Sequence, residues 1–256
     1  MRAKLGQNFL KSRDIAKRIV DLLELKENEK VLEIGGGKGI LTQFLLKKGA
    51  NVFVVEIDKK LVQYLKERFK GSKNLEIINC DILKPNKRLK EIFSSKNFKV
   101  IGNIPFNITS RILEILLTND FFDIAVLTVQ KEVAKRILSS GGRSFGRLTV
   151  QIKTFFSVKK GFDIKRKFFY PIPEVDATVV ILKKKRKYFE GEKRKLWEEF
   201  LMIVFPKKRK YIKNSLSCFL KDKTEEILRN LSLSPDLRPE DIPYFKYEEL
   251  FDIIFN

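Results

Sequence analysis

Histidine is absent from the 256 residues of the sequence, and cysteine occurs only at Cys80 and Cys218. Without histidine the chain cannot form a Ser-His-Asp triad or a Cys-His dyad, and it has no imidazole to move protons or bind a metal. The two cysteines are too few for a disulfide framework and lack the Cys-x-x-Cys spacing of a zinc site. We therefore expect chemistry that uses neither imidazole, nor a metal, nor a disulfide bridge.

Long apolar runs are missing as well. No stretch reaches the roughly 18 apolar residues that span a bilayer, and the basic N-terminal residues are not followed by an apolar signal segment. Hydrophobic residues make up 43% and charged residues 33% of the chain, which is typical of a folded protein rather than a disordered one. We expect a soluble, cytoplasmic protein that does not associate with membranes.

Positive charge predominates over negative charge. The chain has 53 Lys and Arg residues against 32 Asp and Glu residues, so its formal net charge is +21. This balance favours a polyanionic partner such as a nucleic acid. A membrane surface is the alternative partner, but no basic amphipathic helix with a clean apolar face stands out.

Short apolar runs alternate with segments of helical periodicity over the first half of the chain. Ser12 can cap a first helix that ends near Leu25. Strands are predicted at residues 30–34, 51–56, 75–80, 98–102 and 124–129, and further helices after residue 39, at 59–70 and at 109–117. This alternation predicts an α/β fold with a Rossmann-like parallel sheet covered by helices on both faces, and ligands at the carboxyl ends of its strands.

The second half of the chain is harder to interpret. Residues 148–156 fit either a helix or a strand, and residues 175–182 indicate a late strand. Beyond the basic run at 183–187 the pattern is helical, with Trp197, Phe200, Leu201 and Val204 on one face. We therefore expect a catalytic domain over residues 1–185 and a small helical domain over residues 186–256.

A glycine turn follows the first strand of the predicted sheet. Gly35 and Gly37 would let the backbone approach a ligand closely. The turn matches neither the dinucleotide pattern, because Ile40 and Thr42 stand where a third glycine is required, nor the phosphate-binding loop. Taken alone, it is also compatible with a turn that binds nothing.

Carboxylates close the next two strands. Glu56 can accept hydrogen bonds from ribose hydroxyls and Asp81 from an adenine amine, with Ile57 and Ile82 beside them. Either acid alone would be read as a turn residue, and Asp58 is better read as a helix cap. The combination of the glycine turn with Glu56 and Asp81 predicts a pocket that binds a nucleoside but has no phosphate-binding loop. S-adenosylmethionine would fit such a pocket.

The fourth strand ends in Gly-Asn-Ile-Pro-Phe at residues 102–106. An adenine amine is a poor nucleophile, because its lone pair is delocalised into the ring. The side-chain oxygen of Asn103 and the carbonyl of Ile104 or Pro105 could orient such an amine, and Phe106 could stack on the base. The alternative is a strand exit with a structural asparagine and a buried phenylalanine.

These motifs, with others along nearly the whole chain, resemble the KsgA family of small-subunit ribosomal RNA adenine dimethyltransferases. Three departures from the common pattern are Gly36 in place of proline, Phe106 in place of tyrosine and Ala177 in place of serine, and none removes a required group. The matching segments are residues 5–10 (LGQNFL), 33–39 (EIGGGKG), 56–58 (EID), 103–106 (NIPF), 130–133 (QKEV), 145–148 (FGRL) and 171–176 (PIPEVD).

The resemblance implies a class I S-adenosylmethionine-dependent methyltransferase that dimethylates N6 of two adjacent adenosines in the 3′-terminal hairpin loop of small-subunit RNA. It further implies a monomer that acts on the RNA or a pre-30S particle and has a role in small-subunit biogenesis. Asn8 and Leu10 would close over the cofactor, and Phe169 would stack on the second face of the target adenine. The expected cofactor-binding residues are thus Asn8, Leu10, Gly35, Gly37, Glu56, Ile57, Asp81, Ile82 and Asn103, and the expected catalytic residues are Asn103, Pro105, Phe106 and Phe169.

RNA contacts are expected from a basic cluster in the small domain. Its alternative interpretation is a solvated helix face. The aromatic residues Phe155, Phe156, Phe168 and Tyr170 are expected in the core or the site wall rather than as independent RNA platforms. The expected RNA-binding residues are Lys207, Lys208, Arg209, Lys210, Lys213 and Arg147.

Two rival functions remain at this point. One is the related antibiotic-resistance methyltransferase of large-subunit RNA, against which the opening at residues 5–8 and the Pro-x-Pro segment argue. The other is a ribosome-assembly factor that acts mainly by binding. The intact set of Glu56, Asp81 and Asn103 argues for catalysis, although both roles could coexist.

Overall fold

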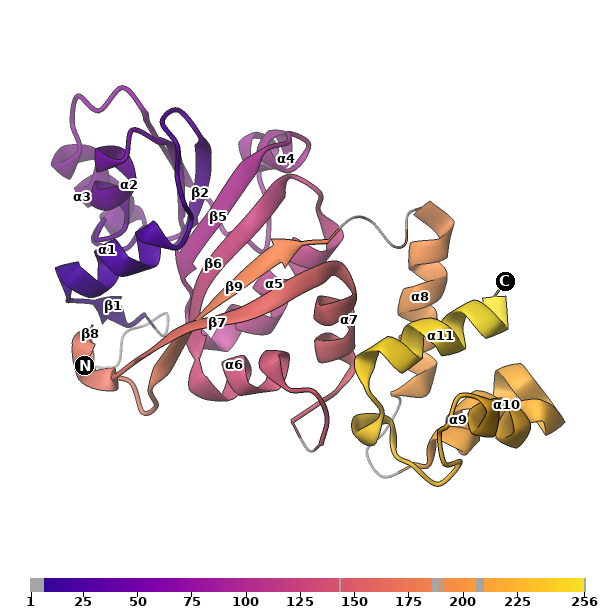
Figure 1. Cartoon of the computed structure of the whole chain (residues 1–256). Helices are drawn as coiled ribbons and strands as arrows, with labels where there is room; N and C mark the ends of the chain where they lie inside the picture. Colours follow the sequence, from indigo (N-terminus) through magenta and orange to yellow (C-terminus); the bar gives the residue numbers. More distant parts are fainter. Residues whose placement is uncertain (1–6, 143, 186–188, 190, 206–209, 256) are drawn as a thin grey trace. The chain divides into compact units, whose positions relative to one another are not determined.

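The computed structural model of the chain describes residues 7–142, 144–185, 189, 191–205 and 210–255 (Figure 1). Its internal contacts divide the chain into two compact units. The larger unit comprises Met1–Ala134 and Val158–Lys184, and the smaller one Lys135–Ser157 and Lys185–Asn256. One boundary was expected after residue 185, whereas residues 135–157 also group with the C-terminal helices.

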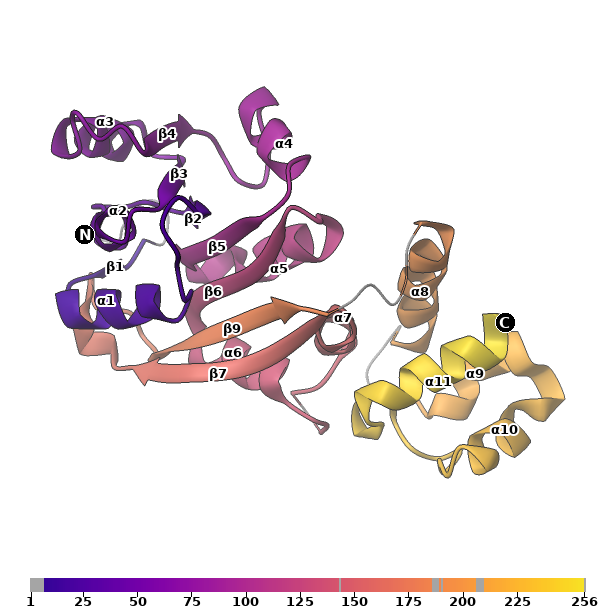
Figure 2. The same cartoon turned by 45° about the horizontal axis from the view of Figure 1, so that its top comes forward.

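A seven-stranded sheet forms the frame of the larger unit (Figure 2). Its strand order is β4-β3-β2-β5-β6-β9-β7. From β2 the chain moves outward through β3 and β4 and then returns to β5, so the order reverses between β2 and β5, where open α/β sheets bind ligands. The strands are β2 (Lys30–Ile34), β3 (Asn51–Glu56), β4 (Leu75–Asn79), β5 (Phe98–Asn103), β6 (Phe122–Gln130), β7 (Phe156–Ile164) and β9 (Ala177–Lys184).

The first five strands run parallel, whereas β9 runs antiparallel to β6. The parallel arrangement expected of these five strands is confirmed, and the late strand expected at residues 175–182 adds an antiparallel neighbour. Parallel neighbours need a long crossover, usually a helix. The segment between β7 and β9 holds only the short 3-10 turn Arg166–Phe168 and β8 (Phe169–Tyr170), and it has no such helix. Hydrophobic periodicity does not encode strand direction, so the direction of β9 could not be predicted from it.

Helices cover both faces of this sheet. One core joins Ala16, Ile19 and Leu45 to strand residues such as Val31 and Ile101. Neighbouring strand residues with the opposite orientation, among them Leu32 and Val100, are also fully buried, so the other face is covered too. The helices along this part of the chain are α1 (Arg13–Asp21), α2 (Thr42–Lys47), α3 (Lys59–Arg68), α4 (Lys87–Phe93), α5 (Thr109–Thr118) and α6 (Lys131–Leu138).

Local signals in the sequence define several of these elements. Ser12 caps α1 by accepting a hydrogen bond from the Ile15 N–H at 3.3 Å, and Asp58 caps α3 by accepting one from the Lys60 N–H at 2.8 Å. Both caps were predicted and are confirmed. Among the described residues, no helix combines the length and the apolarity that crossing a bilayer requires.

The smaller unit is a helical cluster around aromatic side chains. Trp197 lies 5.7 Å from Phe200 and 5.2 Å from Phe251 between ring centroids, and all three rings are buried. The predicted apolar face of Trp197, Phe200, Leu201 and Val204 is confirmed as core. The helices of this unit are α7 (Arg147–Phe155), α8 (Gly191–Val204), α9 (Ile212–Leu220), α10 (Thr224–Asn230) and α11 (Tyr244–Phe255).

A buried acid interrupts the apolar run of β2. Glu33 in β2 is 1% exposed, and its Oε2 accepts a hydrogen bond from the Thr42 hydroxyl at 2.7 Å. Burial raises the pKa of Glu33 to about 8 against the opposing effect of the Thr42 bond, and the nearby charge of Glu56 raises it further. The carboxyl group is therefore mostly protonated at pH 7.

This acid should make the stability of the protein depend on pH. The pKa of Glu33 rises from an ordinary 4.5 to about 8 on folding, so the folded state binds more protons between these values and the free energy of unfolding falls as pH rises through that window. One group contributes up to about 1.4 kcal/mol per pH unit. We expect Glu33→Gln, which keeps an acceptor for Thr42, to flatten this decline in denaturant titrations from pH 5 to 8.

The exposed Glu27 provides the matched control, and Glu27→Gln should leave the pH profile unchanged. Equal slopes for the Glu33→Gln variant and the unmodified protein would contradict a protonated Glu33.

Candidate active site

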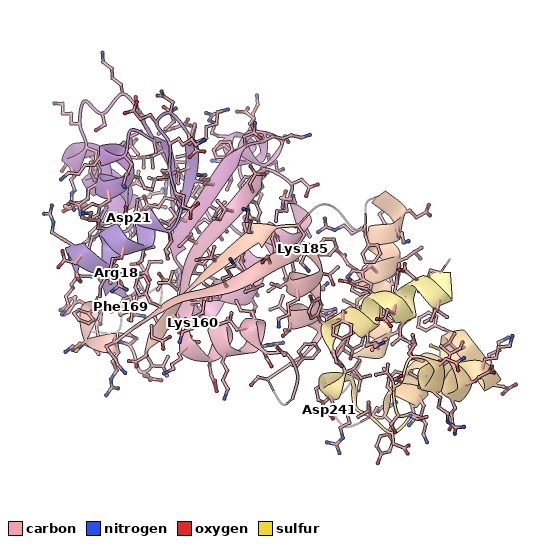
Figure 3. The ribbon with its side chains drawn as sticks, viewed as in Figure 1. Arg18, Asp21, Lys160, Phe169, Lys185 and Asp241 are labelled. Atoms are coloured by element: carbon pink, nitrogen blue, oxygen red, sulfur yellow. The ribbon has the colours of Figure 1, made fainter. Side chains whose placement is uncertain are left out.

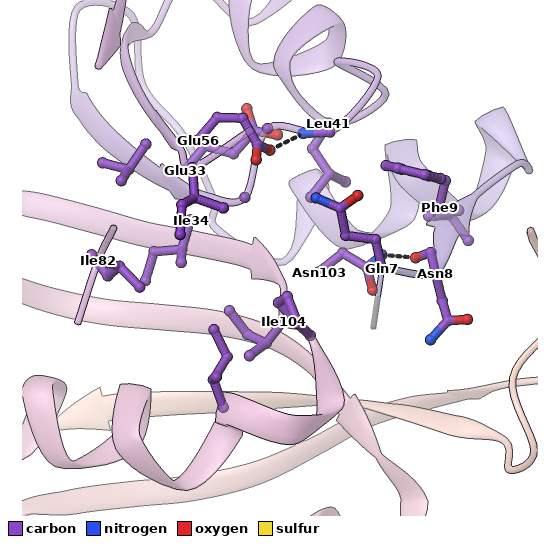
Figure 4. A pocket seen from close by; sticks show the side chains of 18 of the residues that line it. Gln7, Asn8, Phe9, Glu33, Ile34, Leu41, Glu56, Ile82, Asn103 and Ile104 are labelled. Carbon is purple, nitrogen blue, oxygen red and sulfur yellow. Dashed lines mark hydrogen bonds between the residues drawn. The ribbon is translucent and has the colours of Figure 1, made fainter. Parts of the chain in front are cut away.

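A pocket opens at the carboxyl ends of β2, β3, β4 and β5, where the strand order reverses (Figure 4). It brings together residues that are far apart in the sequence, from the N-terminal segment to the exit of β5. Eleven of the residues expected in the site line it: Asn8, Leu10, Gly35, Gly37, Glu56, Ile57, Asp81, Ile82, Asn103, Pro105 and Phe106.

The glycine turn after β2 is held tightly on both sides. Gly35 and Gly37 have φ angles of 76° and 52°, in the left-handed region that favours glycine. A side chain at Gly36 would begin 2.3 Å from the Cγ1 atom of Val54, and one at Gly37 would begin 3.2 Å from the ring of Phe9. The triple glycine therefore does not loosen the turn, because neighbouring side chains enclose it.

Glu56 fixes this turn to the end of β3. Its side chain is 3% exposed. Oε2 accepts a hydrogen bond from the Gly37 N–H at 2.9 Å, and Oε1 accepts one from the Asp58 N–H at 3.0 Å. A carboxylate has about four acceptor positions, so Glu56 can hold the turn and still accept hydrogen bonds from the hydroxyl groups of a ligand.

Asp81 occupies the equivalent place after β4. Its Oδ1 accepts a hydrogen bond from the Leu83 N–H at 2.9 Å, which orients the carboxylate. The side chain is half-buried at the pocket wall, next to Ile82. A donor such as an exocyclic amine can therefore be bound here while an apolar neighbour contacts the ring.

Asn103 lies at the exit of β5 and contacts the N-terminal segment. Its Nδ2 donates a hydrogen bond to the Asn8 carbonyl at 2.8 Å (Figure 4). This bond assigns the amide orientation and leaves Oδ1 as an acceptor. Below it, the Ile104 N–H bonds to the Thr128 carbonyl at 3.1 Å and the Ile108 N–H to the Pro105 carbonyl at 3.2 Å. The strand exit is thus rigid where an amine would be held.

The two aromatic residues expected to sandwich a base occupy different environments. Phe106 begins the 3-10 turn Phe106–Ile108 at the pocket wall and is half-buried. Phe169 is 0% exposed and belongs to the core that includes α1 (Figure 3). The structure does not bring Phe169 into the pocket, so stacking by this ring would require the segment around β8 to move.

The expected RNA-binding residues lie in the smaller unit. Lys207, Lys208 and Arg209 fall outside the described residues. Arg147 is exposed at the start of α7, and Lys210 is also exposed. Lys213 forms an ion pair with Asp236 at 2.8 Å, and this hydrogen-bonded carboxylate raises the pKa of Lys213.

Sequence reasoning missed several pocket residues. Gln7 and Phe9 line the pocket from within the N-terminal motif at residues 5–10, but no role was predicted for them. Lys38 and Ile40 follow the glycines of the turn, and Leu41 opens the next helix. Their position in the sequence, next to residues that were predicted to bind the cofactor, could have identified them. Where the chain runs along a pocket, consecutive residues form its wall.

The chain matches one family model along almost its whole length. Residues 1–254 match the model described as ribosomal RNA adenine dimethylase. Among curated proteins, a protein of Malacoplasma penetrans named ribosomal RNA small subunit methyltransferase A is 42% identical over 97% of this chain and 88% of its own. A protein of the same name from Thermotoga maritima is 41% identical over 86% of this chain and 76% of its own.

Solved structures give the same result for the fold. A dimethyladenosine transferase from Plasmodium falciparum has a TM-score of 0.79 and 28% identity, over 94% of this chain and 95% of its own. The 23S rRNA methyltransferase ErmE has a TM-score of 0.80 and 26% identity, over 97% of this chain and all of its own. Together with the pocket built from the family's motifs, these matches establish that the chain belongs to the ribosomal RNA adenine dimethylase family.

Proposed function

We propose that the protein dimethylates N6 of two adjacent adenosines in the hairpin loop near the 3′ end of small-subunit ribosomal RNA. The methyl donor is S-adenosylmethionine. The observation that carries the proposal is the convergence of Glu56, Asp81 and Asn103 on one pocket at the switch point of the sheet. Curated relatives that are 35–42% identical and named for the small subunit support the choice of RNA.

The pocket residues fit each part of this cofactor. Glu56 has acceptor capacity for the ribose hydroxyls, and Asp81 for the adenine amine, with Ile57 and Ile82 as apolar contacts to the ring. The glycine turn presents backbone at close range to the methionine part. When bound, S-adenosylmethionine supplies an electrophilic methyl group on a cationic sulfur. No metal is needed for its transfer.

Asn103 positions the acceptor nitrogen. Because its Nδ2 donates to Asn8, its Oδ1 can accept a hydrogen bond from the target amine. The Pro105 carbonyl already accepts from Ile108, which favours the Ile104 carbonyl as the second acceptor. These two acceptors would aim the nitrogen lone pair at the methyl group, which would leave the sulfur as a neutral thioether, and the amine proton would pass to water. Phe106 stacks on the base, and the lack of a tyrosine hydroxyl leaves this contact intact.

Recognition of the folded RNA is assigned to the smaller unit. Lys207, Lys208, Arg209 and Lys210 supply charge for phosphate contacts, together with Arg147. Lys213 would have to exchange Asp236 for a phosphate, so we assign it a smaller share. The target base must leave its stack to enter the pocket. We further propose that the protein works as a cytoplasmic monomer on the RNA or the pre-30S particle.

Methylation of large-subunit RNA is the second candidate. The TM-score of 0.80 with a 23S rRNA methyltransferase supports this candidate, because the two chains share one architecture. Incubation with radiolabelled cofactor and each ribosomal subunit, followed by mapping of the modified nucleotides, distinguishes the two. We expect label on two adjacent adenosines of small-subunit RNA that lacks these methyl groups. Label confined to the large subunit would reject the proposal.

Asp81→Ala should weaken cofactor binding. Removal of the charged acceptor of a buried amine lowers the binding free energy by about 1.5–3 kcal/mol, which corresponds to about 10- to 100-fold in affinity. Titration calorimetry with S-adenosylhomocysteine measures the effect. Asp58→Asn serves as the control, because it keeps a helix cap outside the proposed contacts. Unchanged affinity in the Asp81 variant would remove this residue from the site.

Asn103→Ala should slow methyl transfer about hundredfold in a folded protein. A misplaced acceptor at a transfer centre costs on the order of a hundredfold in rate, and the lost bond to Asn8 should weaken cofactor binding only modestly. Single-turnover methylation at saturating cofactor and RNA, paired with a thermal melt, measures both effects. Asn86→Ala removes a structural cap from α4 and should lower the melting temperature with normal turnover. A similar pattern for Asn103→Ala would make Asn103 structural too.

A further inference from the structure

A short antiparallel ladder borders the pocket. β1 (Phe9–Leu10) pairs with β8 (Phe169–Tyr170), with Phe9 opposite Tyr170 and Leu10 opposite Phe169. Directly opposite residues of an antiparallel pair point to the same face, and consecutive residues alternate. Leu10 and Phe169 therefore share one face, which is buried in the core, and Phe9 and Tyr170 share the other.

Both residues of β1 line the pocket, Leu10 from the buried face and Phe9 from the face that carries Tyr170. Phe9 also packs on the glycine turn, where a side chain at Gly37 would begin 3.2 Å from the ring. One residue earlier, the Asn8 carbonyl accepts the hydrogen bond from Asn103. Tyr170 is thus paired directly with Phe9, which lines the pocket. Phe9 is followed back along the chain by Asn8, the residue that accepts the hydrogen bond from Asn103.

Tyr170 exposes 62% of its surface, more than any other large hydrophobic residue described. This differs from the expectation of a core or wall position, and it contrasts with the buried Phe169 next to it. An aromatic ring with both polar and apolar parts that is left in water beside a binding site is a typical contact for a partner.

Exposed lysines flank the ladder that carries this ring. Lys11 extends the ladder through a 2.8 Å bond from its N–H to the Phe168 carbonyl, and its side chain is exposed. Lys167 is also exposed, with its ammonium 5.5 Å from the Phe168 ring centroid. Of the acids that follow β8, Asp176 is engaged by the Lys165 ammonium at 3.1 Å and by the Arg166 N–H at 3.0 Å. An exposed aromatic ring on a ladder flanked by exposed lysines combines the two groups that bind single-stranded nucleic acid.

We propose that Tyr170 is a stacking platform for the nucleobase next to the adenosine being methylated, with Lys11 and Lys167 contacting the phosphates. This inference rests on the proposed function. When one adenosine leaves its stack and enters the pocket, its neighbour loses a stacking partner, and Tyr170 replaces it at the pocket rim. Because the two target adenosines are adjacent, that neighbour is the second target. Tyr170 therefore positions substrate without touching the reacting atoms.

A cycle of protein and RNA changes tests the contact directly. The dissociation constant of a hairpin RNA is measured by fluorescence anisotropy with S-adenosylhomocysteine present, for the intact hairpin and for one with an abasic site at the neighbouring adenosine. Tyr170→Ala should weaken binding of the intact hairpin about tenfold and should have no effect on the abasic hairpin. Tyr170→Phe keeps the stacking ring and should stay within about twofold of the unmodified protein.

Tyr64 provides the matched control. It is 43% exposed and lies on α3, so Tyr64→Ala should leave RNA affinity unchanged. Because Tyr170 is largely exposed, its variants should keep the melting temperature and the cofactor affinity of the unmodified protein. An equal loss on both hairpins, or no loss on either, would overturn the inference.

Failure of this inference is distinguishable from failure of the proposed function. The unmodified protein is assayed first for methylation of small-subunit RNA. If it methylates the two adenosines while Tyr170→Ala binds normally, only the stacking role is wrong. If it methylates another RNA instead, the proposed function fails, and the same cycle on that RNA decides whether Tyr170 stacks beside its target.

Discussion

The carboxylate of Glu56 holds the cofactor pocket together. It accepts one hydrogen bond from Gly37 in the turn after β2 and another from Asp58 at the start of α3, so a single buried side chain joins two strand ends. The turn has little freedom elsewhere, since Val54 and Phe9 stand where side chains would otherwise project. Glu56 therefore shapes the site before any ligand arrives, and its contribution to binding cannot be separated from its contribution to structure by simple deletion.

A further hydrogen bond holds the part of the pocket where the target amine is proposed to bind. The bond from Asn103 to the Asn8 carbonyl joins the exit of β5 to a segment 95 residues earlier in the chain. That segment in turn pairs with β8, almost at the other end of the larger unit's sequence. The residues around the reacting nitrogen are thus positioned by tertiary contacts, while the strands beneath them supply the rigid base.

Much of this arrangement was accessible from the sequence. The apolar runs located β2 and β3 to the residue, because buried parallel strands read as continuous apolar segments, and the residue types after each strand indicated a nucleoside pocket. The burial of Phe169 and the exposure of Tyr170 could not be predicted from the sequence. Both are aromatic and consecutive, and only the register of a two-residue ladder decides which one is buried.

The brevity of that ladder also bears on how the enzyme can cycle. The proposed dimethylation of two adenosines would consume four molecules of donor, so spent cofactor would have to be replaced three times for each RNA. The segment that borders the pocket is held by two residue pairs, the bond from Lys11 to Phe168, the amide contact of Asn103 and the burial of Leu10 in the core. A typical hydrogen bond contributes only about 1 kcal/mol net, and burial of a leucine side chain about 1.5–3 kcal/mol. Exchange of the spent donor by opening of this edge therefore requires the loss of several contacts, while the sheet and the strand exits beneath it stay in place.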